Sequence, residues 1–342
     1  MRMLYKISIF AVITLVVVAA FGSLYYFNKV NSVYNENHSY VFSDDPQYHF
    51  SLILDSEDDV YWQEFKEGAF EAGKVYDAAI EYNLASKNDS NQEIVDYINI
   101  AYESRVDGII VAAENMEEYA PAIDRASEGD FNIVVGVVEN VNNNRLAYVG
   151  TNFYQYGVQA AKLVAQAGGD AGQVDLAVIL SSENSEESDT AATTQNDVML
   201  NGIKSALESE GRINLVTTKY RNSDLLGAED LTRKILTQYP DVDVIFCTNA
   251  KDTAAAARVI VERNLVGRVV IVGTDVTQEI ISYIHKGIVF GVLDRNGYKA
   301  GYQSTELLCN SVGSTFQNNY YDISVEAYTM VNISVYDRID AL

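Results

Sequence analysis

The stretch SLILDSEDDVYWQEFKEG, from Ser51 to Gly68, has the pattern of a buried strand that runs directly into a helix. Its first residues are almost continuously apolar, which is typical of a parallel strand covered on both faces. From Trp62 onward the apolar residues return every three or four positions, which predicts a helix that packs against the sheet. Ligands of open α/β sheets bind outside the carboxyl ends of the strands, so the acidic turn between strand and helix is a candidate site.

The same alternation continues through most of the chain. Further apolar runs of four to eight residues are separated by segments with helical periodicity, which predicts an α/β fold with doubly wound parallel sheets. The runs predicted as strands are 49–54, 79–85, 107–113, 132–138, 174–180, 213–218, 242–247, 269–274 and 288–293. Nine or more strands suit two sheets better than one, and we expect Ala147 to Asn152 to lead from the first sheet to the second.

Length and composition limit the possible functions. The chain has 342 residues, enough for about two domains, and 48% of them are hydrophobic. Its formal net charge is −24, which repels phosphate and argues against nucleic acid as a partner. The two cysteines, Cys247 and Cys309, follow apolar residues, so we expect two buried thiols and no disulfide framework.

The N-terminal residues 1–28 are predicted to be a membrane anchor. No residue from Ile7 to Phe27 is charged, and as a helix this run would be about 31 Å long, which matches the hydrocarbon core of a bilayer. Arg2 and Lys6 place the N-terminus in the cytoplasm and the body outside the cell membrane. The alternative is a secretory signal cleaved near Gly22. Residues 29–47 are polar and aperiodic and are predicted to be a tether.

Polar side chains follow several other predicted strands. They are Glu139 and Asn140, Asn249 with Asp252 one helical turn later, Asp275, and Asp294 with Arg295 and Asn296. A single residue of this kind is usually a helix cap. Several at one sheet edge predict a polar ligand site, because carboxylates, amides and guanidinium groups bind vicinal hydroxyls and an aromatic ring covers the face of a sugar. Tyr61 and Trp62 are about 100° apart on a helix, so at least one ring should line that site.

From about Tyr48 onward the chain resembles the type I periplasmic sugar-binding proteins, the ribose and galactose group. The matching segments are DDVYWQEFKEGAFEAGK, RVDGIIV, YVGTNFYQYGVQAAKLV, YPDVDVIFCTNAKDTAAAARVI and VVIVGTDVTQEIISYIHKG. The resemblance implies two α/β lobes that close on one sugar, joined by three crossings near 150–153, 295–296 and 324–327. It places lobe 1 at 48–151 and 296–325, and lobe 2 at 152–295 and 326–342.

The resemblance also implies a set of ligand-binding residues. Carried over residue by residue, the set is Asp59, Tyr61, Trp62, Glu139, Asn140, Asn249, Asp275 and Arg295, with Asp197, or Asn196 beside it, in the second lobe. Asn140 stands where the family has an arginine, and this departure leaves open a pentose, a hexose, an amine-bearing ligand or another polyol. No catalytic residue, metal ligand or cofactor is implied.

Three functions are compatible with this pattern. The first is a membrane-anchored sensor for a monosaccharide or similar polyol that signals to a histidine kinase, which is the subtype that a type I body behind an N-terminal span resembles. The second is the binding component of an ABC-type sugar importer, with a permease as partner. The third is an enzyme such as a glycosidase, but the sequence has no Gly-x-Ser-x-Gly, P-loop, Gly-x-Gly-x-x-Gly or metal-binding cysteine–histidine spacing. The acidic run 181–189 lacks the glycine of a calcium loop, so we expect a solvated loop there.

Overall fold

The computed structural model describes residues 39–40, 45–85, 90–112, 116–128, 132–136, 147–169, 172–181, 190–221, 227–311 and 319–339. The predicted membrane anchor and most of the predicted tether lie outside these ranges. Within them, no helix combines the length and the apolar character that a bilayer crossing requires.

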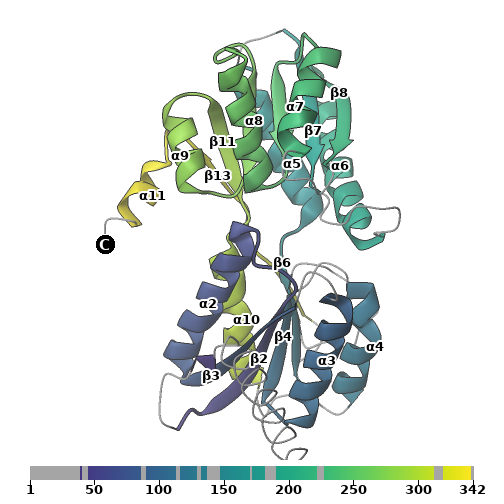
Figure 1. Cartoon of the computed structure of the whole chain (residues 1–342), viewed down its shortest axis with the longest axis vertical. Helices are drawn as coiled ribbons and strands as arrows, with labels where there is room; N and C mark the ends of the chain where they lie inside the picture. The colour runs from purple at the N-terminus through teal and green to yellow at the C-terminus, as the bar shows by residue number, and fades with distance from the viewer. Residues whose placement is uncertain are drawn as a thin grey trace, which may run out of the picture.

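A seven-stranded sheet forms the core of the first lobe, in the order β1-β3-β2-β4-β5-β6-β12. Its strands are β1 (Ser39–Tyr40), β2 (Tyr48–Leu54), β3 (Ala78–Leu84), β4 (Gly108–Ala112), β5 (Ile133–Gly136), β6 (Ala147–Gly150) and β12 (Asn319–Asp322). All neighbours are parallel except β1 and β3. Two pairs of helices cover the two faces (Figure 1): α2 (Val60–Tyr76) with α10 (Gly297–Ser311), and α3 (Ser90–Glu103) with α4 (Met116–Glu128).

A six-stranded sheet forms the second lobe, in the order β13-β11-β10-β9-β7-β8. Its strands are β7 (Val174–Leu180), β8 (Ile213–Tyr220), β9 (Val244–Cys247), β10 (Val270–Thr274), β11 (Val289–Asp294) and β13 (Glu326–Thr329). One hydrophobic cluster packs α5 (Phe153–Ala167) and α6 (Thr190–Glu210) on one face. A second cluster packs α7 (Gly227–Gln238), α8 (Ala250–Glu262) and α9 (Gln278–His285) on the other, and α11 (Ser334–Ile339) follows β13.

The α/β fold with two parallel-sheet lobes is confirmed, and every run predicted as a strand contains one. Both cysteines are buried free thiols, as expected. Each sheet also carries one antiparallel strand that was not predicted, because β1 pairs antiparallel with β3 and β13 pairs antiparallel with β11. The strands β1, β12 and β13 lie at sheet edges and were not predicted, because their sequences contain no apolar run. The edge strand β8 keeps such a run and was predicted.

Both lobes share one strand order. In the first lobe β2 lies between β3 and β4, and in the second β7 lies between β8 and β9. The chain therefore moves to one side of the first strand to form the second strand, and then crosses to its other side to form the third. Open α/β sheets bind their ligands at the carboxyl ends of the strands where the strand order reverses in this way.

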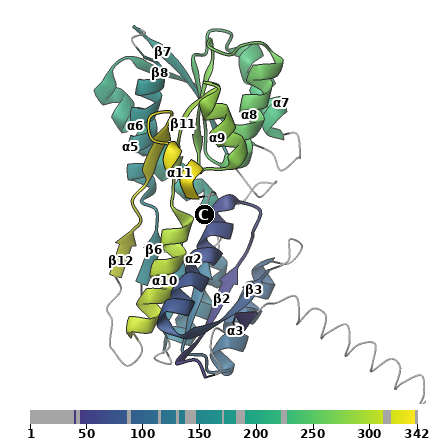
Figure 2. The same cartoon turned by 90° about the vertical axis from the view of Figure 1, so that its left-hand side faces the viewer.

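Three short segments connect the two sheets, and the lobes follow one another along the long axis of the molecule (Figure 2). They are 151–152, 295–296 and 323–325. The first and third are joined by hydrogen bonds: Ile323 N–H donates to the Gly150 carbonyl oxygen at 2.8 Å, and Asn152 N–H donates to Asp322 Oδ1 at 3.2 Å. Short paired crossings allow the lobes to pivot as rigid bodies. The lobe boundaries set from the sequence stay a prediction.

Close packing of α2 against α10 fixes the start of α2 beside the second crossing. A Cβ atom at Gly301 would overlap the Phe65 carbonyl oxygen, and one at Gly68 would overlap that of Tyr298. Only glycine lets the two backbones approach so closely. At the end of α2 nearest the second lobe, Val60 packs against the hydrophobic cluster of α7, α8 and α9. The acidic turn before α2 is therefore held against the opposite lobe.

Candidate ligand-binding site between the sheets

Asp59 connects the first lobe to the segment that crosses between the lobes. It is the N-cap of α2, and its Oδ1 accepts a hydrogen bond from Tyr61 N–H at 3.4 Å. Its Oδ2 accepts from Nη2 of Arg295 at 2.9 Å. Capping explains an acid at this position, since a helix N-terminus has unpaired N–H groups. The second carboxylate oxygen of Asp59 therefore faces Arg295, which follows strand β11 of the second lobe.

Asp275 and Arg295 form the centre of the site. Asp275 directly follows β10 and is 1% exposed, with a left-handed φ of 57°. Its carboxylate accepts from the backbone N–H of Arg295 at 3.2 Å and from Nε at 3.1 Å, and Nη2 also donates to it. A left-handed non-glycine residue is strained, and such residues cluster at functional sites. The fixed backbone and several hydrogen bonds hold the guanidinium group in one orientation.

Burial and charge act against each other in this ion pair. Burial disfavours the charge on Arg295, but the carboxylates of Asp275 and Asp59 outweigh it and hold the pKa of Arg295 well above its usual value. Burial raises the pKa of Asp275 to about 6, against the opposing effect of Arg295. Both groups are therefore charged at neutral pH. Removing one partner would leave the other as a buried, poorly compensated charge.

The two aromatic rings are both buried. Tyr61 and Trp62 are 2% and 3% exposed, with ring centroids 5.2 Å apart in an edge-to-face arrangement. The expectation that one of these rings lines a ligand site stays a prediction. Side chains in a helix lean toward its N-terminus, and Tyr61 lies in the first turn, so its ring extends past the helix start. There the Arg295 guanidinium covers it at 4.5 Å from the centroid.

Asn249 is the N-cap of α8. Its Oδ1 accepts a hydrogen bond from Asp252 N–H at 2.7 Å, and the side chain of Thr253 donates to its carbonyl oxygen at 2.7 Å. The residue is 7% exposed. The capping role uses only the side-chain oxygen, so the amide nitrogen keeps its two N–H donors for another partner.

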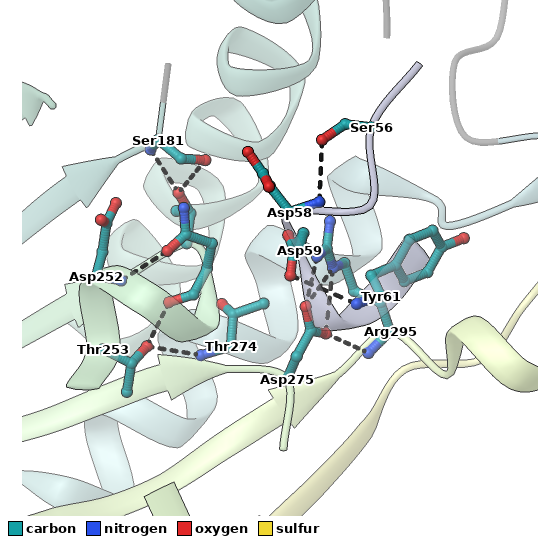
Figure 3. A network of polar contacts seen from close by, with 12 residues as sticks. Ser56, Asp58, Asp59, Tyr61, Ser181, Asp252, Thr253, Thr274, Asp275 and Arg295 are labelled. Carbon is teal, nitrogen blue, oxygen red and sulfur yellow. Dashed lines mark hydrogen bonds and ion pairs between the residues drawn. The ribbon is translucent and has the colours of Figure 1, made fainter. Parts of the chain in front are cut away.

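Polar residues follow five neighbouring parallel strands of the second sheet. They are Arg221 after β8, Ser181 after β7, Thr248 after β9, Asp275 after β10 and Arg295 after β11. Ser181 N–H donates to Thr248 Oγ1 at 2.9 Å. Figure 3 shows Ser181, Asp252 and Thr253 grouped at one end of this edge, and Asp59, Asp275 and Arg295 at the other. The carboxyl edge of the sheet thus presents a continuous row of hydrogen-bonding groups.

Two acids near this row carry raised pKa values. Asp252 was noted among the polar residues near strand ends but not in the set of ligand-binding residues, and Glu64 was not noted at all. Asp252, on α8, is 1% exposed, and Nε of Arg221 lies 2.8 Å from its Oδ1. Glu64, on α2, is partly buried, and burial together with Asp294 and Asp275 raises its pKa to about 8. Arg221 could have been found from the sequence, because it directly follows a strand. Glu64 lies within a helix and carries no such signal.

The structure does not place every other predicted residue at this centre. Glu139 and Asn140 lie outside the described residues. Asp197 is exposed on α6, where its charge adds to the effect of burial in raising the pKa of Tyr220. Arg295 contacts Asp59, Tyr61 and Asp275, and Trp62 packs against Tyr61. Within the described ranges, no group of three or more histidines, cysteines or acids could hold a metal ion.

The model of the periplasmic binding protein domain matches residues 50–314. The chain belongs to the periplasmic binding protein family. This binding protein is 19% identical over 270 residues to the D-allose-binding periplasmic protein of Escherichia coli (strain K12), with 77% of the chain and 84% of the relative covered. The family consists of binding proteins, which agrees with the prediction that the chain is not an enzyme.

Solved structures show the same two-lobed architecture. A sugar-binding protein of a sugar ABC transporter from Bacillus halodurans has a TM-score of 0.74 at 20% identity, covering 84% of this chain and 99% of that chain. A chain of the XylFII–LytSN complex has a TM-score of 0.71 at 24% identity, covering 84% of this chain and 100% of that chain. At these identities the likeness shows the fold, and it confirms the type I fold that the sequence predicted.

Proposed function

We propose that this protein binds a monosaccharide or a similar polyol outside the cytoplasm, between its two lobes. The observation that carries the proposal is the contact of Arg295 with Asp275 of the second lobe and Asp59 of the first. One guanidinium group thus links the polar ends of strands from both sheets. A ligand bound there touches both lobes at once.

The chemistry of the row favours a polyhydroxylated ligand. A carboxylate accepts hydrogen bonds from two neighbouring hydroxyls, while an amide or guanidinium group donates to a hydroxyl oxygen. Asp275, Asn249 and Arg295 provide both functions within one edge of the sheet. The relatives agree in ligand class, because one is described as D-allose-binding and another as sugar-binding.

Ligand binding is proposed to favour a closed arrangement of the lobes. A ligand shifts a conformational equilibrium only through its different affinities for the two states. A sugar that bonds to both sheets makes its full set of contacts only when the lobes meet. The three short crossings are the elements able to bend as this happens.

We further propose that the protein is a membrane-anchored sensor that passes the closed state to a histidine kinase. The uncharged run from Ile7 to Phe27 supports an anchor, and the XylFII–LytSN structure is a precedent for this fold in a complex with another protein. The alternative is the binding component of an ABC-type importer, which the transporter-associated structure favours. Purification from membranes of the native host distinguishes them: recovery with a kinase supports the sensor, and recovery with permease subunits alone contradicts it.

A thermal-shift screen of the full-length chain tests the sugar proposal. The panel is D-allose, D-galactose, D-glucose, D-xylose, D-ribose and L-arabinose. A ligand that binds only the folded state at 100 times its Kd adds about 2.7 kcal/mol to the free energy of unfolding. At least one sugar should therefore raise Tm by several degrees. If no sugar changes Tm and none gives heat in a titration, the proposed function is wrong.

A further inference from the structure

Arg221 and Asp252 form a second ion pair at the carboxyl edge of the second sheet. Arg221 directly follows β8, and Asp252 lies in the first turn of α8. Nε of Arg221 is 2.8 Å from Oδ1 of Asp252, and the side chains are 15% and 2% exposed. The backbone N–H of Asp252 is held by the Asn249 side chain, so the pair is fixed against a predicted ligand residue.

The pair leaves two buried polar atoms with unused hydrogen-bonding capacity. Within the described part of the chain, Oδ2 of Asp252 has no hydrogen-bond partner, and Nε of Arg221 is close to its carboxylate without hydrogen-bond alignment. Buried polar atoms are costly when they are not matched, because they have lost their contacts with water. The carboxylate oxygen accepts and the guanidinium N–H donates, so one group that does both would satisfy the two atoms together.

Electrostatics place the pair near the first lobe as well. Burial raises the pKa of Asp252 to about 6, against the effect of Arg221, and the charge of Asp59 raises it further. Asp59 belongs to the acidic turn before α2 and also contacts Arg295. Asp252 and Asp275 therefore respond to the same carboxylate from the opposite lobe, which puts both acids on the side of the sheet that faces that lobe.

We propose that Arg221 and Asp252 form a specificity-determining subsite that binds one hydroxyl of the ligand, with the hydroxyl donating a hydrogen bond to Asp252 and Arg221 donating one to the hydroxyl oxygen. This inference rests on the proposed function and adds to it a second point of recognition. Asp275 and Arg295 hold one end of the ligand, and Asp252, which lies toward the other end of this edge (Figure 3), binds a hydroxyl there together with Arg221. The position and orientation of that hydroxyl distinguish one sugar from its epimer.

The test uses the full-length chain, the sugar of the thermal-shift panel that raises Tm most, and its monodeoxy analogues. Affinities are measured by calorimetry for the wild type, Asp252→Asn, Arg221→Gln and Asp243→Asn. Asp243 is the matched control, because its carboxylate accepts a hydrogen bond in the same sheet but at the opposite edge, from Asp175 N–H at 2.8 Å. The control should bind like the wild type.

We expect Asp252→Asn and Arg221→Gln to weaken binding of the parent sugar about tenfold or more, since a hydroxyl would lose a charged partner. The deciding result concerns the analogues. For one deoxy position, the wild type should lose the most affinity, and each variant, which keeps only one of the two contacts to that hydroxyl, should lose clearly less. Discrimination at the other positions should be unchanged. If one variant does not fold, the other answers the same question, because the two residues bind the same hydroxyl.

Two results would overturn the subsite. Unchanged affinity in both variants would show that the ligand does not contact the pair, while the proposed function would stand. An equal loss of affinity for the parent sugar and every analogue in the variants would show that the ion pair only stabilises the start of α8. A wild type that binds no sugar would instead refute the proposed function, and the subsite with it.

Discussion

Arg295 is the residue on which the contact between the lobes depends. It directly follows a strand of the second sheet, yet it hydrogen-bonds to Asp275 of that sheet and Asp59 of the other, and its guanidinium lies over Tyr61. Three different interactions therefore fix one side chain. A guanidinium group suits this position because it is planar, always charged and able to donate in several directions.

Removing the acceptor of this group should abolish tight binding. Asp275→Ala leaves Asp59 as the only carboxylate bonded to Arg295 and leaves a ligand hydroxyl without its acceptor. Asn249→Ala removes a hydrogen-bond donor from the same edge and should also weaken binding. We expect the Asp275 change to weaken sugar affinity about tenfold or more. Titration calorimetry measures the effect, and circular dichroism checks the fold. Wild-type affinity in a folded Asp275→Ala protein would remove Asp275 from the site.

The hydroxyl of Tyr61 is predicted to destabilise the fold. Among the described residues it is buried and has no hydrogen-bond partner, whereas the hydroxyl of Tyr156 is hydrogen-bonded to Thr274. Tyr61→Phe should therefore leave the free energy of unfolding unchanged or raise it by about 1 kcal/mol, and Tyr156→Phe should lower it by a similar amount. Urea denaturation of both variants gives the comparison. A large loss of stability in Tyr61→Phe would show that its hydroxyl has a partner in solution.

Glu64 should make stability depend on pH. Burial is the main cause that raises its pKa to about 8, with Asp294 and Asp275 adding to it. The folded chain therefore keeps a proton that the unfolded chain has released above about pH 4.5. Stability falls as the pH rises from this value to about 8, by about 1.4 kcal/mol for each pKa unit of the shift.

Glu64→Gln removes the titrating carboxyl group, so proton uptake at position 64 no longer differs between the folded and unfolded chains. The variant should lose less stability than the wild type between pH 5 and pH 8, and it should be the more stable of the two at pH 8. Urea denaturation of both proteins at the two pH values measures the effect. Asp252 and Asp275 contribute equally to both proteins, so the difference between the proteins reports Glu64. Parallel losses in both proteins would mean that Glu64 titrates normally.

The residues of the site differ in how far the sequence could predict them. Asp275 and Arg295 were predicted because they directly follow apolar strands whose ends must share an edge. Their contact with Asp59 could not be derived in this way, because it joins residues of different lobes and depends on how the lobes meet. The direction of the Tyr61 ring also depends on Arg295, since helical periodicity describes only the angle at which a side chain leaves the helix.

Among the elements, α2 and α10 set the geometry of the first lobe at the site. The glycines in their contact allow the helix backbones to touch, and the N-terminus of α2 then reaches the second lobe. The central strands and these helices could be predicted from hydrophobic periodicity. The edge strands β1, β12 and β13 could not, because their sequences contain no apolar run.

Enlarging a glycine in this contact should separate the helices. A Cβ at position 301 would overlap a backbone oxygen of α2, so Gly301→Ala should lower the free energy of unfolding by about 2 kcal/mol or more, as overpacking does. Gly172→Ala is the control, because a Cβ there meets no atom within 4 Å. Urea denaturation of both proteins measures the effect. Equal stability would show that α2 and α10 can move apart without cost.

At the scale of the whole molecule, two lobes with one strand order face each other across three short crossings. The carboxyl edges of both sheets carry the polar residues, and Arg295 already joins them. On the proposed function, a ligand that bonds to both edges holds the lobes together, and the closed arrangement is what a partner recognises.

The structure of the full-length chain in complex with the sugar that raises Tm most tests this account most directly. We predict that the sugar lies between the two sheets, with hydroxyls within hydrogen-bonding distance of Asp275 and Asn249 and with Arg295 at its edge. A sugar bound on an outer face of either lobe, or between the lobes without contact to these residues, would contradict the account.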